Sequence, residues 1–197
     1  YIDGRTALLC EPLVVYVRAA LRLAVGGWRT EEMLRLMKTD LWPLTPVEIA
    51  EIENYVYTWR IEGAAWDKEW TENPAGLGRE MTQRDKNILA RLNRCREALM
   101  TSLWELRRPL RGEGTGRQFA LTVYNWLAGQ TELPRRLAEQ AACLEEMAQT
   151  VLADHAARLW DEVIGILDRF VLAVGEQRLP AKRLEELFTL LCGMLDM

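Results

Sequence analysis

The sequence is poor in the residues that most catalytic sites use. One histidine, His155, and one serine, Ser102, occur in 197 residues. Ser102 falls inside an amphipathic helical pattern, so a serine nucleophile is nearly excluded. His155 lies within another helical pattern with no nucleophile near it in the sequence, which favours a structural role over general-base catalysis. Paired carboxylates are adjacent on helices, where neighbouring side chains point about 100° apart. We therefore predict no catalytic residues in this chain.

Cysteine is also sparse and scattered. The four cysteines, Cys10, Cys95, Cys143 and Cys192, contain no CxxC pair. With a single histidine beside them, this spacing argues against zinc, and we predict no metal ligands. We find neither a secretory signal nor an apolar run long enough to cross a bilayer. We expect a reduced, soluble, cytoplasmic protein with no membrane contact.

Phosphate-binding loops are missing as well. No GxxxxGK[ST] segment occurs, which excludes that route to binding a nucleoside triphosphate. The glycine-rich stretch 112–116 has neither an apolar strand before it nor a lysine after it. It predicts a flexible turn between two helices.

Apolar residues at helical spacing dominate what is present. The longest such pattern runs from Leu133 to Val174 in steps of three and four. Pro134 and Gly175 stand where a first-turn proline and a C-terminal glycine cap are typical. At about 1.5 Å per residue the run spans roughly 60 Å, so we expect a break or bend, or a helix that crosses the whole domain. We predict that the rest of the chain is organised around this one very long helix.

Shorter helical patterns fill most of the remaining sequence. Their starts are marked by Pro12, Thr30, Thr45 and Thr115, and one further pattern runs from about Met81 to Pro109. Residues 67–80 have no sustained period and predict a flexible loop, with Trp66 and Trp70 tucked beneath it. No strand pattern of convincing length occurs. The predicted fold class is all-α: one irregular helical domain of seven or eight helices over residues 1–197.

Basic residues gather in one segment of an acidic chain. The net charge is −4, yet Arg79–Arg117 holds ten basic residues against five acidic ones. Such a segment is either a polyanion-binding surface or one solvated helix face, and both interpretations stay open. DNA contacts here would be made to phosphates and would be independent of base sequence. The candidate DNA-backbone residues are Arg91, Arg94, Arg107, Arg108 and Arg111. Trp104, beside the last three, is the candidate for stacking on a base.

Four stretches, taken in order, resemble one protein family. They are YIDGRTALLCEPLVVYVRAAL, GGWRTEEMLRLMKTDLWPLT, EIENYVYTWRIEGAAW and, near the end, LWDEVIGILDRFVLAVGEQRLPAKRLEELF. The most specific positions are Trp28-Arg29, Glu32, Arg35 and Lys38-Thr39-Asp40-Leu41, supported by Ile52-Glu53-Asn54-Tyr55, Gly63 and Trp66. Together they resemble the middle of AddB, a component of the bacterial AddAB helicase–nucleases.

The resemblance implies a parent function rather than a site. It implies pairing with a helicase–nuclease partner, AddA, and ATP-dependent processing of broken DNA ends for recombinational repair. The parent protein would be a superfamily-1 helicase-like protein without motor function, followed by a nuclease domain with an iron–sulfur cluster and Mg²⁺. The family's phosphate loop, nuclease carboxylates and cluster cysteines lie outside this chain, so no cofactor is expected within it. The chain would be the helical insertion that corresponds to the 2B subdomain, a fragment of a longer protein.

From this we expect a non-catalytic helical module that contacts the partner subunit, duplex DNA, or both. The two ends of such an insertion should lie near each other. The alternative is a pure protein–protein scaffold with no DNA contact, which exposed apolar patches with few nearby arginines would favour. A third hypothesis, an independent helical enzyme, needs a cleft of converging carboxylates or His155, and the sequence offers little toward it.

Overall fold

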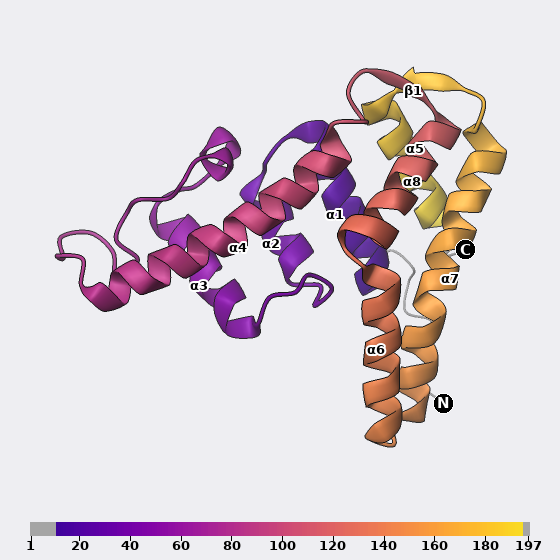
Figure 1. Cartoon of the computed structure of the whole chain (residues 1–197). Coiled ribbons are helices and arrows are strands. Elements are labelled where there is room, and N and C mark those ends of the chain that lie inside the picture. Colours follow the sequence, from indigo (N-terminus) through magenta and orange to yellow (C-terminus); the bar gives the residue numbers. More distant parts are fainter. Residues whose placement is uncertain (1–10, 195–197) are drawn as a thin grey trace.

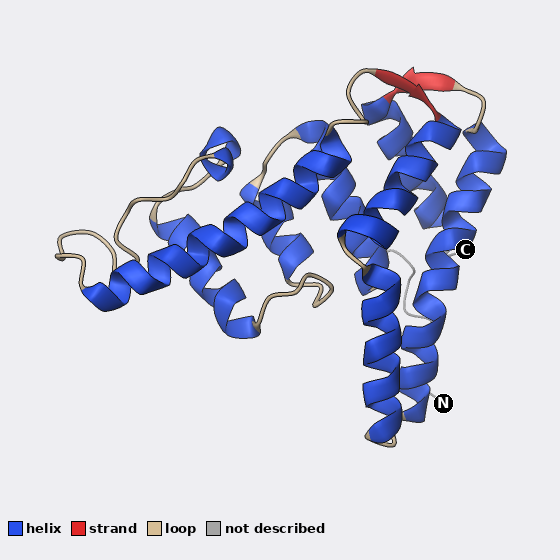
Figure 2. Cartoon of the chain, in the orientation of Figure 1, coloured by secondary structure: helices blue, strands red, loops and turns tan. Residues whose placement is uncertain are grey.

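Helices make up nearly all of the computed structural model, which describes residues 11–194 (Figure 1, Figure 2). The eight α-helices in this range are α1 Pro12–Gly26, α2 Thr30–Met37, α3 Pro46–Thr58, α4 Gln83–Arg107, α5 Gly116–Asn125, α6 Leu133–Glu146, α7 Thr150–Val174 and α8 Ala181–Met194. A 3-10 helix, η2 (Gly63–Asp67), and a π-helical turn, η3 (Trp126–Gln130), lie between them. The predicted all-α class and the number of helices are confirmed for the described part of the chain.

The helix at the centre of the core is α1. Nine of its fifteen residues are buried, and it packs against α2, α4, α7 and α8. Pro12 occupies its first turn. The helix ends at Gly26 and is capped by Gly27, whose φ of 103° only glycine adopts readily. Because apolar residues lie on more than one side of α1, neighbours cover it on several sides.

The prediction of one very long helix over 133–174 is wrong. Helix α6 ends at Glu146 and α7 begins at Thr150, and the two pack side by side as a helical hairpin (Figure 1). Ala148, in the turn, has a φ of 58° and so lies in the left-handed region. A break was one of the alternatives that the length of roughly 60 Å left open, and a single helix crossing the domain was another. The break lets the apolar stripes of α6 and α7 cover each other, whereas a single helix would extend one stripe into solvent.

Capping boxes start three of the helices. In each, a threonine hydroxyl accepts from the backbone N–H three residues later, and the side chain of that residue accepts from the threonine N–H. The three pairs are Thr45 with Glu48, Thr82 with Asp85, and Thr115 with Gln118. The predictions at Thr45 and Thr115 are confirmed.

The prediction that Thr30 caps the start of α2 is wrong. Thr30 lies in the first turn of the helix, and Arg29 occupies the N-cap position without a side-chain cap. The Thr30 hydroxyl donates to the carbonyl oxygen of Ile61 and accepts from Nε1 of Trp66 at 3.0 Å. The side chain is therefore used for a long-range contact that local sequence does not show.

A short two-stranded ladder lies beside α5 (Figure 2). Strands β1 (Glu113–Thr115) and β2 (Arg178–Pro180) pair antiparallel, with Gly114 opposite Leu179. The sequence did not predict these two strands, because three residues are too few to show an alternating pattern.

Gly116 brings the start of α5 against the end of α7. Its N–H donates to the Gln177 carbonyl oxygen at 3.2 Å, and the next amide, of Arg117, donates to the Gly175 carbonyl oxygen at 3.0 Å. A Cβ at Gly116 would lie 2.4 Å from the Val174 carbonyl oxygen. Only glycine allows the two backbones to come this close.

Hydrogen bonds hold the base of the predicted flexible loop 67–80. The Tyr55 hydroxyl donates to the carbonyl oxygen of Glu72 and accepts from its N–H. The Asn73 side chain donates to the Arg79 carbonyl oxygen and accepts from the Ala75 N–H. These bonds tie the segment to α3 and to itself, above the two tryptophans that are buried as predicted.

The predicted closeness of the chain ends falls partly outside the described residues, since Tyr1 is not among them. Within the described range, the first and last helices, α1 and α8, pack against each other. None of the helices that the structure describes is both long and apolar enough to span a membrane.

Candidate nucleic-acid interface

Two tryptophans share one carboxylate, and two arginines lie against their rings, where α4 ends beside α1. Trp28 and Trp104 meet edge to face, with 5.2 Å between ring centroids. The Asp67 carboxylate, at the end of η2, accepts a hydrogen bond from each indole N–H at 2.8 Å. The Arg107 guanidinium lies 4.9 Å from the Trp28 centroid and 5.6 Å from that of Trp104, and the Arg111 guanidinium lies 5.4 Å from the latter. We call these five residues the tryptophan–arginine cluster.

Arg107 is held from inside the molecule. Its Nη1 atom donates to the carbonyl oxygens of Leu23 and Ala24 at 3.1 and 3.0 Å. These carbonyls belong to the last turn of α1, where the negative end of the helix dipole favours a cation. Of the five candidate arginines, this one therefore has a clear role in the fold.

Two further candidates already have carboxylate partners. Arg91 binds Glu51 of α3 through Nη2 at 2.6 Å and Nε at 3.2 Å, and the hydrogen bond to Glu51 raises the pKa of Arg91. Arg108 pairs with Glu105 at 2.6 Å on the surface of α4. Because a carboxylate competes with phosphate for a guanidinium, both pairs weaken the attraction of these arginines for DNA.

Arg94 and Arg111 are exposed and pair with no carboxylate among residues 11–194. Arg94 and Arg107 are thirteen positions apart on α4, which is about 20 Å along the helix axis. The structure thus divides the candidates into a group at Arg91 and Arg94 and a group at the end of α4. About six base pairs of B-DNA cover that separation.

Trp104 belongs to the second group and is half-buried. Its ring makes a T-shaped contact with Trp28 and lies beside two guanidiniums, and its N–H donates to Asp67. A nucleobase can stack on it only where these neighbours leave the ring open. The stacking role stays a prediction.

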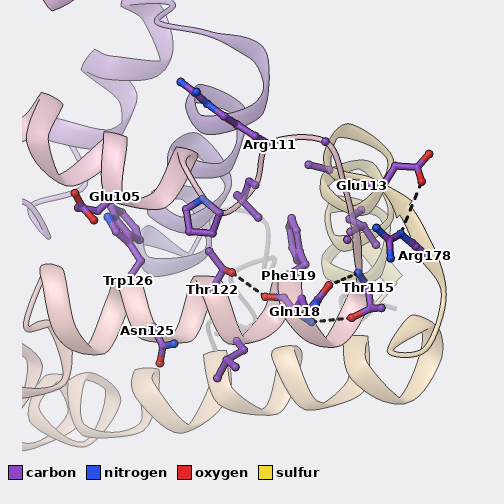
Figure 3. A pocket seen from close by; sticks show the side chains of 17 residues that line it. Glu105, Arg111, Glu113, Thr115, Gln118, Phe119, Thr122, Asn125, Trp126 and Arg178 are labelled. Atoms are coloured by element: carbon purple, nitrogen blue, oxygen red, sulfur yellow. Dashed lines mark hydrogen bonds and ion pairs between the residues drawn. The ribbon is translucent and has the colours of Figure 1, made fainter.

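A cavity of about 660 Å³ opens next to this cluster, between the end of α4, α5 and the start of α8 (Figure 3). Phe119 and Trp126 contribute apolar lining, and Arg111 and Arg178 lie at its edge. Arg178 lies 3.9 Å from the Glu113 carboxylate. The volume suits a small ligand, but because both signs of charge line it, the cavity does not select anions.

The groups whose pKa values are shifted serve the fold. Hydrogen bonds from Thr45 lower the pKa of Glu48, and hydrogen bonds from Thr82 lower the pKa of Asp85. Burial raises the pKa of Tyr55 to about 12. These carboxylates are helix caps, which stay ionised as acceptors, and are not poised for proton transfer.

The one serine is likewise used in packing. Ser102 Oγ accepts from Nε1 of Trp126 at 3.0 Å in the buried interior. The side chain of His155 lies outside the described part of the structure.

Sequence reasoning missed three residues that shape this region. Asp67 is 37 residues from Trp104 and Glu51 is 40 from Arg91, so no local pattern joins them. Trp28, which the sequence showed as a position of the resemblance, is buried and supports Arg107.

Comparison with curated proteins identifies relatives of this segment. Over 195 aligned residues, which cover 91% of the chain, the sequence is 31% identical to AddB, the B component of the ATP-dependent helicase/deoxyribonuclease, of Geobacillus thermodenitrificans. Identity is also 31% to the AddB of Geobacillus kaustophilus, and 26% over 96% of the chain to that of Bacillus mycoides. The chain is homologous to a segment of AddB. The resemblance drawn from the sequence is confirmed.

The chain spans only 16% of the length of the Geobacillus AddB proteins. No protein-family profile matches it. The similarity therefore identifies the relatives of this segment, while the activity of a whole AddB protein is a matter for proposal.

The iron–sulfur cluster and Mg²⁺ that the resemblance to AddB implies do not fit the described residues. Cys95, Cys143 and Cys192 lie on three different helices, α4, α6 and α8, and are half-buried, exposed and buried. Within residues 11–194, no three or more histidine, cysteine, aspartate or glutamate side chains converge to hold a metal. Cys10 lies outside the described residues. No step of the proposed function runs through these groups.

Proposed function

We propose that this chain is a non-catalytic helical module of an AddB-type protein, and that the parent protein works with an AddA-like helicase–nuclease partner on broken DNA ends in the cytoplasm. The module corresponds in this proposal to the 2B-like insertion of a superfamily-1 helicase-like fold. The observation that carries it is the similarity to AddB over 91% of the chain.

A structural role agrees with how the polar groups are used. The acidic side chains with lowered pKa values cap helices, and Ser102 binds a tryptophan. The tryptophan–arginine cluster joins η2 to α4 through Asp67 and Trp104, and α4 to α1 through the hydrogen bonds of Arg107. Carboxylate, hydroxyl and guanidinium groups are catalytic in many enzymes, but in this protein these groups hold helices together.

Contact with DNA is the role that we assign to the unpaired arginines. Arg111 is exposed, and its guanidinium lies over the Trp104 ring. That ring is held in place by the hydrogen bond from its N–H to Asp67. Arg94 presents a second unpaired guanidinium on α4, about 20 Å along the helix axis from Arg107, where the helix ends. Guanidiniums at this spacing contact phosphates without reading bases.

The test is fluorescence anisotropy of a labelled forked duplex titrated with the 197-residue chain over a series of salt concentrations. We expect binding that weakens steeply with salt. The Arg94→Gln/Arg111→Gln variant should bind more weakly, and its slope of log K against log salt should be smaller by about 2, since each lost phosphate contact contributes about 0.9.

The matched control is Arg91→Gln/Arg108→Gln, which removes the same charge from arginines that have carboxylate partners. It should lower the affinity less than the first variant does. Equal losses from both variants would contradict the assignment of the contact to Arg94 and Arg111.

The second candidate is a protein–protein scaffold that does not touch DNA. It is favoured by the finding that Arg91, Arg107 and Arg108 already have partners within the protein. In that case no anisotropy change appears even at low salt, and the basic segment is a solvated and internally bonded helix face.

A further inference from the structure

The helical hairpin of α6 and α7 extends away from α2, α3 and α4, and its turn lies at the far end of the molecule (Figure 1). We define the hairpin tip as residues 145–154, which comprise the end of α6, the turn and the first residues of α7. None of the residues that carry the DNA proposal lies in it, so an inference about the tip stands independently of that proposal.

Large apolar side chains are exposed at the tip. Met147 is 62% exposed, Val151 79% and Leu152 54%. Three such residues within six positions of one compact turn form a cluster, whereas single exposed apolar residues elsewhere are ordinary. Leu152 continues the stripe of Ala156 and Leu159, which are buried nearer the body. The apolar stripe of α7 therefore runs past the part of the protein that covers it.

Within residues 145–154 the charged side chains are all acidic, and the next arginine along α7, Arg158, donates from Nε to the Asp154 carbonyl oxygen at 3.1 Å. Glu145, Glu146 and Asp154 lie in the tip, and residues 145–154 contain no lysine or arginine. All three carboxylates are on exposed residues. The tip thus combines an apolar centre with an acidic rim.

The turn itself is ordered by hydrogen bonds. The N–H of Met147 donates to the Cys143 carbonyl oxygen and that of Gln149 to the Leu144 carbonyl oxygen, at 3.2 and 2.9 Å. Ala148 is held in the left-handed region. The exposed side chains are therefore presented from a defined backbone, which reduces the entropy lost when a partner binds.

We propose that the hairpin tip docks a basic amphipathic helix of another protein. The apolar face of such a helix would cover Met147, Val151 and Leu152, while its lysines or arginines meet the acidic rim. An unbranched methionine beside acidic residues adapts readily to a helix of this kind. Charge argues against other occupants: a second copy would bring three carboxylates against three, and nucleic acid or an anionic membrane would be repelled.

The experiment titrates the chain into a fluorescently labelled synthetic helix that has leucines on one face and lysines on the other, and follows anisotropy. We expect saturable binding. The Met147→Ser/Val151→Ser/Leu152→Ser variant should bind at least about tenfold more weakly. Because Leu152 is partly packed, Glu145→Lys/Glu146→Lys is the second variant. It changes only exposed residues and should also weaken binding at least about tenfold.

Two controls separate this site from general attraction between an acidic protein and a basic peptide. Leu172→Ser/Leu190→Ser alters residues that are 87% and 59% exposed but lie outside the tip, and should leave the affinity unchanged. A peptide with glutamate in place of lysine should not bind. The proposal is overturned by absence of binding, by equal binding to the triple-serine variant, or by self-association in sedimentation that the triple-serine variant abolishes.

Discussion

Replacing Arg107 with glutamine distinguishes a fold-stabilising arginine from one that meets DNA. The side chain is half-buried and lies against two tryptophans. Its Nη1 donates to two carbonyl oxygens at the end of α1. Glutamine has a shorter side chain and no charge, so it loses the contacts with both rings and with the helix end. Arg108, the next residue, is exposed, and within residues 11–194 its ion-pair partner is Glu105 alone, which makes it the matched control.

The expected loss follows from the contacts. A hydrogen bond from a charged donor stabilises by about 1.5–3 kcal/mol, a cation at a helix C-terminus by about 0.3–1 kcal/mol, and a cation–π contact by about 0.5–1 kcal/mol. These values overlap, because one guanidinium makes all the contacts, and we expect about 2–4 kcal/mol in total. In a domain of this size that corresponds to a fall in Tm of roughly 4–16 °C.

The assay is thermal and urea unfolding of the wild-type chain and of the Arg107→Gln and Arg108→Gln variants. Arg108→Gln should cost less than about 1 kcal/mol, as exposed ion pairs do. Arg107→Lys keeps the charge but loses the planar fork, so it should fall between wild type and Arg107→Gln. The reasoning is refuted if Arg107→Gln is as stable as Arg108→Gln.

Two further predictions concern the backbone and the helix caps. Gly116→Ala should destabilise the chain by about 1–3 kcal/mol in urea unfolding, because the new Cβ would lie 2.4 Å from the Val174 carbonyl oxygen. The control is Gly129→Ala, since no atom lies within 4 Å of a Cβ at that position. The pKa of Glu48 is lowered by hydrogen bonds from Thr45, so the cap stabilises α3 fully above the ordinary carboxyl pKa near 4.5 and loses this effect as pH falls through the lowered value. Thr45→Ala should reduce stability at pH 7 by about 1 kcal/mol and flatten its fall below pH 4.5, and an unchanged acid profile in this variant would count against the capping role.

Local signals in the sequence predicted the start and type of most helices. Threonine at Thr45 and Thr115, followed three residues later by glutamate or glutamine, marks capping boxes that the structure contains. Pro12 and Pro134 lie in the first turns of α1 and α6. These signals succeed because capping hydrogen bonds join residues only three apart and need no tertiary partner.

The candidate interface was predictable only in part. The sequence showed that arginines are concentrated between residues 79 and 117, but their partners lie elsewhere: Glu51 is on α3, and the carbonyls that bind Arg107 are on α1. Whether an arginine is available to a phosphate depends on these distant groups, which no spacing within the segment reveals.

The Leu133–Val174 stretch shows most clearly which features local sequence determines and which depend on tertiary packing. Its apolar period, fixed by the geometry of the α-helix, determined that the stretch is helical and which side chains form its stripe. That α6 and α7 fold back on each other, and that α1 and not this stretch lies at the centre, was decided by packing. An apolar stripe on a helix is stable only when another element covers it, but any neighbour of suitable shape can do so. The sequence of the stripe therefore does not identify the covering element, which is determined by the packing of the whole chain.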